Sequence, residues 1–515
     1  MTLLQADPVA PVPGHGEQDG PVPHVRVAVV GSGFSGLGAA IRLKRDGIED
    51  FVVLERAGDV GGTWRDNTYP GCACDVPSQL YSFSFALNPG WTRSFSPQPE
   101  IQEYLRRCVR EHGLGPYLRF DQELLEAAWD GERRHWRLRT SGGAWTAQVL
   151  ILGTGPLSEP SVPSIPGLER FRGTVFHSAQ WNHDHDLAGE RVAVVGTGAS
   201  AIQFVPHLQH AAARLHLFQR TPPWILPRVD RSITGAERWL FRHLPGAQRI
   251  ARLGVYWSRE SSVVGFTREP RLMKLVERLA RRHLRRQVPD PELRRRLTPS
   301  YTIGCKRILL SNDYYRAVSR PNVELVTDGI AEVREHSIVT RDGAEREVDT
   351  IILGTGFHVT DSPTMRRVRG RDGVSLAESW RLGMSAYLGT SIAGFPNLFM
   401  LVGPNTGLGH NSIVLMIESQ LAYISDALRH MAESGATSVE VRPEVQSAFE
   451  NEVQARMPRT VWSSGGCASW YLDARGNNTT LWPGSTWGYR LRTRRFDPAC
   501  HVTQGVRAPA GANAA

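Results

Sequence analysis

The same strand–turn–helix pattern occurs at two distant places in the chain. VRVAVV at 25–30 is an apolar, β-branched run of strand length, followed by GSGFSG and a helical pattern. RVAVV at 191–195 is likewise followed by GTGASA and a helical pattern. A further apolar run of strand length comes after each helix, at 51–54 and at 215–218. Two strands joined by a helix form a βαβ unit of a parallel sheet. The repetition therefore predicts an α/β fold with two copies of one module.

The glycines of the first turn predict that its module binds a dinucleotide. Gly31 permits the tight turn, Gly33 lets the backbone approach a pyrophosphate, and Gly36 lets the helix pack on the strand. The N–H groups and the dipole at the helix N-terminus favour an anion there. Glu55 closes the second strand at a spacing typical of an acid that binds ribose hydroxyls. The alternative is an ordinary glycine-rich turn, which requires neither the flanking elements nor the acid.

The second turn repeats the pattern with Gly196, Gly198 and Ala201, and alanine in the third place still permits close packing. Arg220 lies as far along the chain from Gly196 as Glu55 lies from Gly31. A carboxylate at this strand end would repel a 2′-phosphate, whereas a guanidinium binds one with two parallel hydrogen bonds. An arginine in the place of the acid predicts that the second module binds NADPH. The alternative is that Arg220 only faces solvent.

Two segments indicate where the chain crosses between the modules, and a third indicates an insertion. VLILGTGP at 149–156 and TIILGTGF at 350–357 are both buried-type strands that run into a glycine-rich turn. Helical patterning with many arginines interrupts the second module. We therefore expect two Rossmann-like domains with an inserted helical subdomain and two disordered tails. The expected boundaries are 1–24 for the first tail, 25–158 and 358–500 for the first domain, 159–222 and 301–357 for the second domain, 223–300 for the insertion, and 501–515 for the second tail.

The composition excludes several classes of protein. No run of eighteen apolar residues occurs, so no integral membrane segment is expected. The N-terminus lacks the basic start and apolar middle of a signal peptide. The six cysteines contain no C-x-x-C pair, so no metal site and no redox dithiol are expected. A disulfide framework is implausible in so large a chain with so few thiols, which favours a cytoplasmic protein. The six cysteines are Cys72, Cys74, Cys108, Cys305, Cys467 and Cys500.

The formal net charge of +9 arises locally, because 60 basic residues stand among 51 acidic ones. The excess is greatest over Arg271–Arg296, which contains RLARRHLRRQ and ELRRR. The favoured interpretation is a solvated helical face, and the alternative is a surface that binds membranes or nucleic acid. We expect no nucleic-acid partner, and phosphate-rich cofactors would use some of the positive charge.

Three motifs resemble those of the class B flavoprotein monooxygenases, and among these the type I Baeyer–Villiger monooxygenases match best. FRGTVFHSAQWN at 171–182 follows the family fingerprint at Phe171, Gly173, His177 and Trp181, and departs from it at Asn182. Related enzymes that oxidise nitrogen or sulfur have Phe or Tyr in place of Trp181. A second family motif is complete over 61–75, and a Lys-Arg pair stands in GCKRILLSNDYY. The family resemblance extends from Val25 to about His501.

This resemblance implies an enzyme that uses FAD and NADPH. The implied reaction inserts one oxygen atom of dioxygen next to a ketone carbonyl through a C(4a)-peroxyflavin and yields an ester or lactone. Oxygenation of nitrogen or sulfur in a small molecule remains the alternative within the class. A flavin-dependent disulfide reductase would need a cysteine pair with redox spacing, and a non-catalytic protein would use the basic helix for binding.

The resemblance also assigns roles to individual residues. Arg307 matches the catalytic arginine, and Asp75 is expected to hold it through a bidentate pair. His177 is expected to act in the linker between the modules, and Trp470 is the tryptophan most expected beside a cofactor. The implied FAD-binding residues are Gly31, Gly33, Gly36, Glu55, Trp64, Asp75 and Tyr81. The implied NADPH-binding residues are Gly196, Thr197, Gly198, Ser200, Arg220, Thr221 and Lys306.

Overall fold

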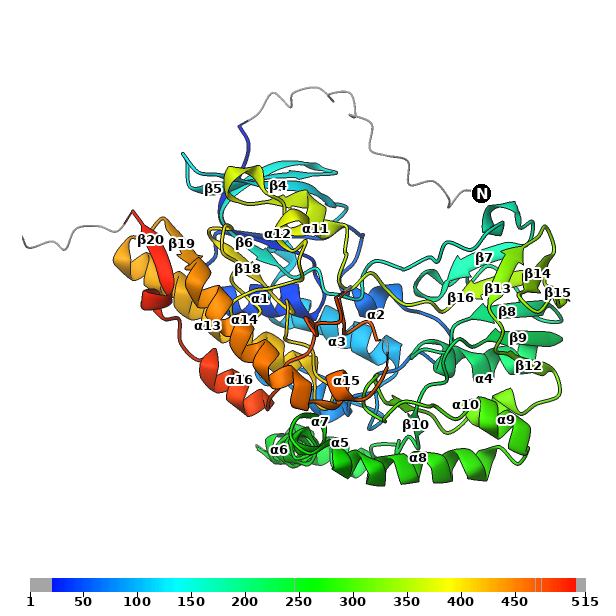
Figure 1. The fold of residues 1–515 in the computed structure, drawn as a ribbon. Helices are drawn as coiled ribbons and strands as arrows, with labels where there is room; N and C mark the ends of the chain where they lie inside the picture. Colours follow the sequence, from blue (N-terminus) through cyan, green and yellow to red (C-terminus); the bar gives the residue numbers. More distant parts are fainter. Residues whose placement is uncertain (1–20, 245, 468, 474, 506–515) are drawn as a thin grey trace, which may run out of the picture.

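Two sheets with parallel strands form the framework of the protein. The computed structural model describes residues 21–244, 246–467, 469–473 and 475–505. In Figure 1 the larger sheet lies with the blue N-terminal strands, and the smaller sheet lies at the opposite end of the molecule. Of the tails expected at 1–24 and 501–515, residues 1–20 and 506–515 fall outside the described residues.

The larger sheet is built around β1 (His24–Val30), which pairs in parallel with β2 (Phe51–Leu54) and with β6 (Gly143–Leu152). Helix α1 (Phe34–Arg45) connects β1 to β2, so the first predicted βαβ unit is present. The strand order is β17-β4-β5-β6-β1-β2-β3, and β18 also pairs with β6. The remaining strands are β3 (Leu118–Arg119), β4 (Leu124–Asp130), β5 (His135–Thr140), β17 (Val368–Arg369) and β18 (Leu398–Met400).

The smaller sheet repeats this arrangement around β8 (Arg191–Val195). Helix α4 (Ala201–Ala211) connects β8 to β9 (Arg214–Phe218), and all neighbouring strands are parallel. The strand order is β12-β9-β8-β16-β7, with β12 (Val323–Val326), β16 (Thr350–Leu353) and β7 (Thr174–His177). An antiparallel sheet of β13 (Ile330–Val333), β14 (Ser337–Thr340) and β15 (Glu345–Glu347) extends this half. The predicted α/β fold with two Rossmann-like modules is therefore confirmed.

A group of helices interrupts the second module between β10 (Ile225–Leu226) and β11 (Leu309–Leu310), which pair in parallel. In Figure 1 these helices form the green lower edge of the molecule. We call this group the helical insertion; it comprises α5 (Gly235–His243), α6 (Ala247–Glu260), α7 (Val263–Thr267), α8 (Met273–Gln287) and α9 (Pro291–Arg296).

The C-terminal part of the chain returns to the larger sheet. Helix α13 (Ile413–Ser434) packs along α1, so a segment from late in the sequence covers the first βαβ unit. The other helices are α2 (Thr63–Asp66), α3 (Gln98–Glu111), α10 (Tyr314–Val318), α11 (Thr364–Arg367), α12 (Leu376–Ser379), α14 (Pro443–Arg456), α15 (Val461–Ser464) and α16 (Thr486–Arg492). Among the described residues, no helix combines the length and the apolar character needed to cross a membrane.

The expected tail boundaries need correction at both ends. His24 already belongs to β1, and His501–Gln504 form β20, which pairs antiparallel with β19 (Ser438–Val441). His501 is buried and its Nε2 lies 2.8 Å from the Tyr423 hydroxyl. A strand of four mostly polar residues has no recognisable pattern of its own, and its partner strand lies about sixty residues earlier in the chain. The pairing therefore depends on the tertiary fold.

Glu260, at the end of α6, anchors the insertion to the C-terminal part of the chain. Its buried carboxylate accepts hydrogen bonds from Asn411 Nδ2 at 2.8 Å and from Thr486 Oγ1 at 2.6 Å, and His410 Nε2 lies 3.5 Å away. Burial opposes the charge on this carboxylate, but these neighbours outweigh it and lower the pKa of Glu260 to about 2. The carboxylate of the folded protein is therefore charged at any pH well above 2, and the stability that its charge contributes is lost as the pH falls towards this pKa.

Replacing Glu260 with Ala should destabilise the protein, because the buried Asn411 and Thr486 donors then lack an acceptor. An unsatisfied buried donor costs about 1–3 kcal/mol, so the melting temperature should fall by several degrees. Glu269→Ala is the matched control, since Glu269 is exposed in the same insertion and makes only a 3.9 Å ion pair with Arg271. Equal melting temperatures for the two variants would contradict the anchoring role of Glu260.

Candidate active site

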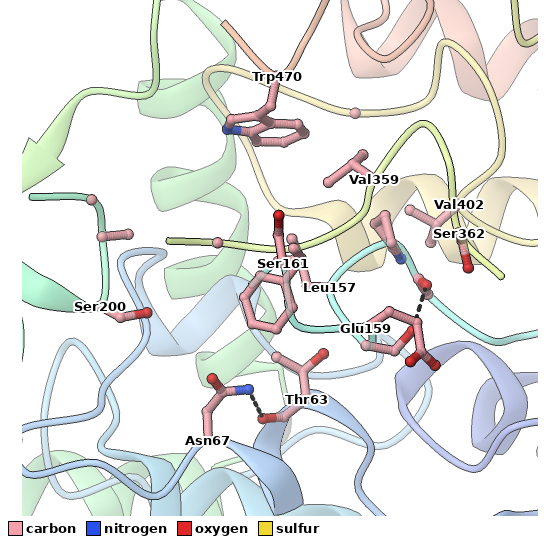
Figure 2. A pocket seen from close by; sticks show the side chains of 18 of the residues that line it. Thr63, Asn67, Leu157, Glu159, Ser161, Ser200, Val359, Ser362, Val402 and Trp470 are labelled. Atoms are coloured by element: carbon pink, nitrogen blue, oxygen red, sulfur yellow. Dashed lines mark hydrogen bonds between the residues drawn. The ribbon is translucent and has the colours of Figure 1, made fainter. Parts of the chain in front are cut away.

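One cavity of about 1330 Å³ opens between the two modules. Its walls come from the carboxyl ends of the strands in both sheets, where ligands bind in open α/β folds. Figure 2 shows Trp470 across the cavity from Thr63 and Asn67, with Leu157 and Ser161 between them and Ser200 at one side. All of the site residues expected from the sequence except Gly36 line this cavity: Gly31, Gly33, Glu55, Trp64, Asp75, Tyr81, Gly196, Thr197, Gly198, Ser200, Arg220, Thr221, Lys306 and Arg307.

The first glycine turn fits the pyrophosphate-binding geometry inferred from its spacing. Gly31 has a φ of +95°, and a Cβ there would lie 2.8 Å from the Gly153 carbonyl oxygen. Gly36 lies beneath this turn, where a Cβ would come 1.7 Å from the Gly31 oxygen, so both positions require glycine for packing. A Cβ on Gly33 would meet nothing closer than 3.8 Å. The packing of the chain does not require glycine at position 33. The absence of a side chain on Gly33 leaves room for a phosphate beside the backbone.

Glu55 is held at the end of β2 beside this turn. Its Oε2 accepts hydrogen bonds from the Ser32 amide at 2.9 Å and the Ser32 hydroxyl at 2.7 Å. Its Oε1 accepts hydrogen bonds from the Ala57 amide and from Arg65. The carboxylate is thereby fixed at the edge of the cavity that it lines.

The second turn has the same design at the end of β8. Gly196 has a φ of +111°, and a Cβ there would lie 2.4 Å from the Gly354 carbonyl oxygen. A Cβ on Gly198 would meet no atom within 4 Å. As in the first turn, packing requires the first glycine, and the second leaves the backbone open toward the cavity. The Thr197 hydroxyl donates a 3.4 Å hydrogen bond to the Thr221 carbonyl and joins the turn to the end of β9.

Arg220 and Lys306 place two cations beside the second turn. Partial burial lowers the pKa of Lys306, and the positive charge of Arg220 lowers it further. Within the described part of the chain, neither side chain forms an ion pair with a carboxylate. Two cations that repel each other at a cavity wall are stabilised by a bound anion, and a 2′-phosphate on the ribose of a nicotinamide cofactor supplies one.

Arg307 and Asp75 form a bidentate ion pair at the cavity wall. Nε and one terminal nitrogen of Arg307 each lie 2.6 Å from a different oxygen of Asp75. The charge of Asp75 raises the pKa of Arg307. Enclosure by protein opposes ionisation of Asp75, yet the charge and hydrogen bonds of Arg307 keep its pKa below the usual range. The side chains remain 37% and 27% exposed, so the guanidinium faces the cavity as a permanent cation.

Aromatic side chains form the wall beside this pair. The Trp64 indole donates a 3.0 Å hydrogen bond to the Tyr81 hydroxyl, and the two rings meet edge to face. Trp470 also lines the cavity, and its neighbour Tyr471 is buried within reach of the Arg307 charge. No motif in the sequence marks Tyr471 as a site residue, and its position next to Trp470 is the only indication of its place at the cavity wall. Trp462 and Trp482, by contrast, are core residues.

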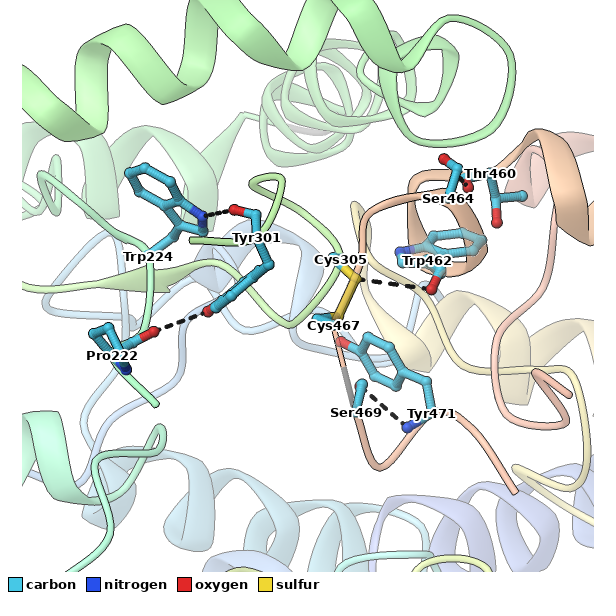
Figure 3. Close-up of a disulfide and its surroundings, with 10 residues drawn as sticks. All are labelled: Pro222, Trp224, Tyr301, Cys305, Thr460, Trp462, Ser464, Cys467, Ser469 and Tyr471. Carbon is cyan, nitrogen blue, oxygen red and sulfur yellow. Dashed lines mark hydrogen bonds between the residues drawn. A yellow bond between two sulfur atoms is a disulfide. The ribbon is translucent and has the colours of Figure 1, made fainter. Parts of the chain in front are cut away.

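A disulfide explains how the C-terminal segment reaches this wall. Cys305 and Cys467 are joined although they are 162 residues apart, and Cys305 directly precedes Lys306 and Arg307. Figure 3 shows Tyr471 beside the bridge. The expectation that scattered cysteines would form no disulfides is therefore corrected for this pair. The fold brings their Cα atoms within 6.1 Å, which their spacing in the sequence does not reveal.

His177 and Trp181 lie away from the cavity: His177 ends β7 of the smaller sheet, and Trp181 follows it after a short turn. The linker role expected for His177 stays a prediction. The His177 ring is buried against Phe357, on the segment that leaves β16 for the larger sheet. Burial lowers the pKa of His177 to about 4, so the ring is neutral at physiological pH. Trp181 packs against Phe176 and Phe204. His177 thus joins the predicted fingerprint to the crossing segment, and Trp181 joins it to α4 of the second module.

Comparison with known proteins identifies the family. The model of the FMO-like, flavin-binding monooxygenase-like family matches residues 24–239. The chain is 57% identical to a Baeyer–Villiger monooxygenase of Streptomyces coelicolor over 96% of this chain and 95% of that protein. A Baeyer–Villiger monooxygenase of Pseudomonas aeruginosa is 53% identical, over 93% and 92%. The structure of OTEMO in complex with FAD and NADP superimposes with a TM-score of 0.83 at 27% identity, covering 92% of this chain and 97% of OTEMO. The two sheets, the paired glycine turns and these similarities agree, and the chain belongs to the Baeyer–Villiger monooxygenase family.

Proposed function

We propose that this protein is an FAD- and NADPH-dependent monooxygenase that inserts one oxygen atom of dioxygen next to the carbonyl of a small-molecule ketone, giving an ester or lactone. The observation that carries the proposal is the single cavity that two dinucleotide cradles share with the Asp75–Arg307 pair. The names of the relatives and the cofactors bound by OTEMO support it.

We assign FAD to the first module and NADPH to the second. Gly31 and Gly33 would hold the FAD pyrophosphate, and Glu55 its ribose. Arg220 and Lys306 would hold the 2′-phosphate of NADPH by charge-assisted hydrogen bonds. When bound, the flavin accepts electrons from NADPH and activates dioxygen, which is chemistry that protein side chains do not supply. The domain boundaries expected from the sequence, corrected at His24 and at His501–Gln504, are proposed for this assignment.

Arg307 supplies the positive charge that oxygen insertion needs. Negative charge develops on oxygen during this reaction, and a cation already oriented toward that position stabilises it without reorganisation. Asp75 fixes the plane of the guanidinium, while the raised pKa of Arg307 keeps it protonated throughout. Arg307 is therefore a stabilising cation and not a proton donor.

The apolar lining of the cavity favours an apolar ketone. Leu157, Val359, Val402 and Trp470 contribute side chains to the wall (Figure 2). Burying an apolar substrate against them expels water from the site, which strengthens the interaction of the developing charge with Arg307.

The first test is the colour of the purified protein. We expect a yellow protein whose absorption spectrum is that of non-covalently bound FAD, released on denaturation. The measurement is the visible spectrum before and after heat release. A colourless protein that is folded by circular dichroism and takes up no added FAD would refute the proposed function.

Arg220→Ala should weaken NADPH selectively. The substitution removes one or two charge-assisted hydrogen bonds of about 1.5–3 kcal/mol each, so the KM for NADPH should rise about tenfold or more. The KM for NADH should hardly change, because NADH lacks the 2′-phosphate. Arg172→Ala is the matched control, since Arg172 is exposed and lies outside the cavity. Equal weakening of both cofactors would show that Arg220 does not bind the phosphate.

The pH profile of the same variant provides a second readout. Binding of NADPH requires protonated Lys306, so the KM should rise as pH increases through the lowered pKa of this residue. Removing Arg220 removes its repulsion of the Lys306 ammonium. The alkaline rise of KM should therefore occur at higher pH in Arg220→Ala than in the parent, and an unchanged profile would argue against their coupling.

Arg307→Ala should separate NADPH oxidation from ester formation. Loss of an oriented charge beside a developing anion lowers the rate about a hundredfold to a thousandfold. We expect the variant to retain FAD and to oxidise NADPH, with hydrogen peroxide replacing the ester. NADPH consumption, peroxide and ester are measured in one reaction, with ketone, amine and sulfide substrates compared.

Two further variants control for the unpaired Asp75 carboxylate. Arg307→Lys keeps a charge without the bidentate geometry and should retain part of the ester activity. Arg307→Ala combined with Asp75→Asn removes the unpaired charge and should recover stability but not ester formation. Ester formation at the parental rate in Arg307→Ala, or recovery in the double variant, would show that Arg307 is only structural.

A further inference from the structure

Exposed apolar side chains are concentrated in the helical insertion. Of the twenty large apolar residues that are exposed in the described chain, ten lie between Trp239 and Leu279. Trp239 is 61% exposed, Ile250 73%, Trp257 52% and Leu275 62%. Single exposed apolar residues are normal on protein surfaces, but a cluster of this density marks an interaction surface.

The spacing places these residues in stripes along two helices. Ile250, Leu253 and Trp257 follow one another at intervals of three and four residues, so they lie on one face of α6. Leu275 and Leu279 share a face of α8. Helix α8 already buries a separate apolar face against the protein, formed by residues such as Ala280 and Leu284. The exposed stripe is therefore not needed to attach α8 to the fold.

The same segment contains the positive charge of the protein. Residues 235–296 carry sixteen Arg and Lys against six Asp and Glu, a net charge of +10, while the whole chain has +9. On α8, Glu277 pairs with Arg281, whereas Arg278, Arg282, Arg285 and Arg286 are exposed and have no carboxylate partner among the described residues. The outer surface of the insertion thus combines large apolar side chains with cations.

We propose that the outer face of the helical insertion docks on an anionic lipid surface. Tryptophan and leucine enter the boundary between headgroups and acyl chains, while arginine side chains reach the anionic headgroups. Figure 1 shows α5, α6 and α8 along one edge of the molecule, with both sheets on the other side of them, so a flat surface can approach this edge. The absence of a membrane-spanning helix among the described residues is compatible with docking at the surface.

Charge distinguishes this occupant from the alternatives. A second copy bound through the same face would bring two segments of net charge +10 together, which opposes association. Nucleic acid would neutralise the arginines but offers no apolar environment to Trp239, Trp257 and the leucines. An anionic lipid surface satisfies both kinds of side chain. The proposal concerns binding and does not rest on the proposed function.

The test is cosedimentation of the full-length, FAD-loaded protein with vesicles. One set consists of phosphatidylcholine, and the other contains equal parts of phosphatidylcholine and phosphatidylglycerol. We expect binding to the anionic vesicles, weakening as salt is added, and little binding to phosphatidylcholine alone. Equal binding to both vesicles, or to neither, overturns the proposal.

Paired variants separate the apolar and the charged contributions. Trp257→Gln with Leu275→Gln should lower the affinity for anionic vesicles at least tenfold, as should Arg282→Gln with Arg286→Gln. Leu382→Gln with Leu491→Gln is the control for exposed apolar residues outside the insertion, and it should bind as the parent does. NADPH oxidation should remain at the parental level in every variant, because none of these residues lines the cavity.

Three results would overturn the proposal in different ways. Loss of binding in the arginine variant but not in the Trp257 and Leu275 variant would indicate adsorption by charge alone. A dimer in light scattering that the Trp257 and Leu275 variant dissociates, without vesicle binding, would assign the face to a second copy. Retention on double-stranded DNA without vesicle binding would assign it to nucleic acid.

Discussion

The ion pair between Arg307 and Asp75 is the interaction on which the site depends. Asp75 lies in the first module, after α2, and Arg307 lies on the segment that returns from the helical insertion to the second module, 232 residues later. Two hydrogen bonds of 2.6 Å hold these segments together at the cavity. The pair therefore fixes the Arg307 cation at the wall of the cavity that both modules share.

The other cations of the cavity are arranged on a different principle. Arg307 has a carboxylate partner and is held rigidly, whereas Arg220 and Lys306 repel each other beside the second turn. A paired cation can act on a transient charge without leaving its position. Unpaired cations gain most from a permanent anion, which supports the proposal that Arg220 and Lys306 bind a phosphate. In the proposed function, the two arrangements divide the cavity into a reacting region and a binding region.

Contacts of the helical insertion link its outer helices to the wall of the cavity. Glu260 joins its helix α6 to Asn411, which lines the cavity, and to Thr486 in the C-terminal part. The disulfide of Cys305 joins the loop of Arg307 to the segment that carries Tyr471. Short contacts and one disulfide thus link the insertion and the C-terminal segment to the cavity wall.

The sequence alone predicted the two modules, which the structure confirms, and it predicted a nucleotide preference for each. Strand runs, glycine turns and the residues at the strand ends are local patterns, so Gly31, Gly196, Glu55 and Arg220 were identified without coordinates. The family resemblance added Asp75 and Arg307, whose pairing across 232 residues no periodicity encodes. Only the tertiary structure decided that Cys305 meets Cys467, that Tyr471 reaches the Arg307 wall, and that His501–Gln504 form a strand. These contacts join segments far apart in the chain, and packing of the whole fold, rather than local preference, brings them together.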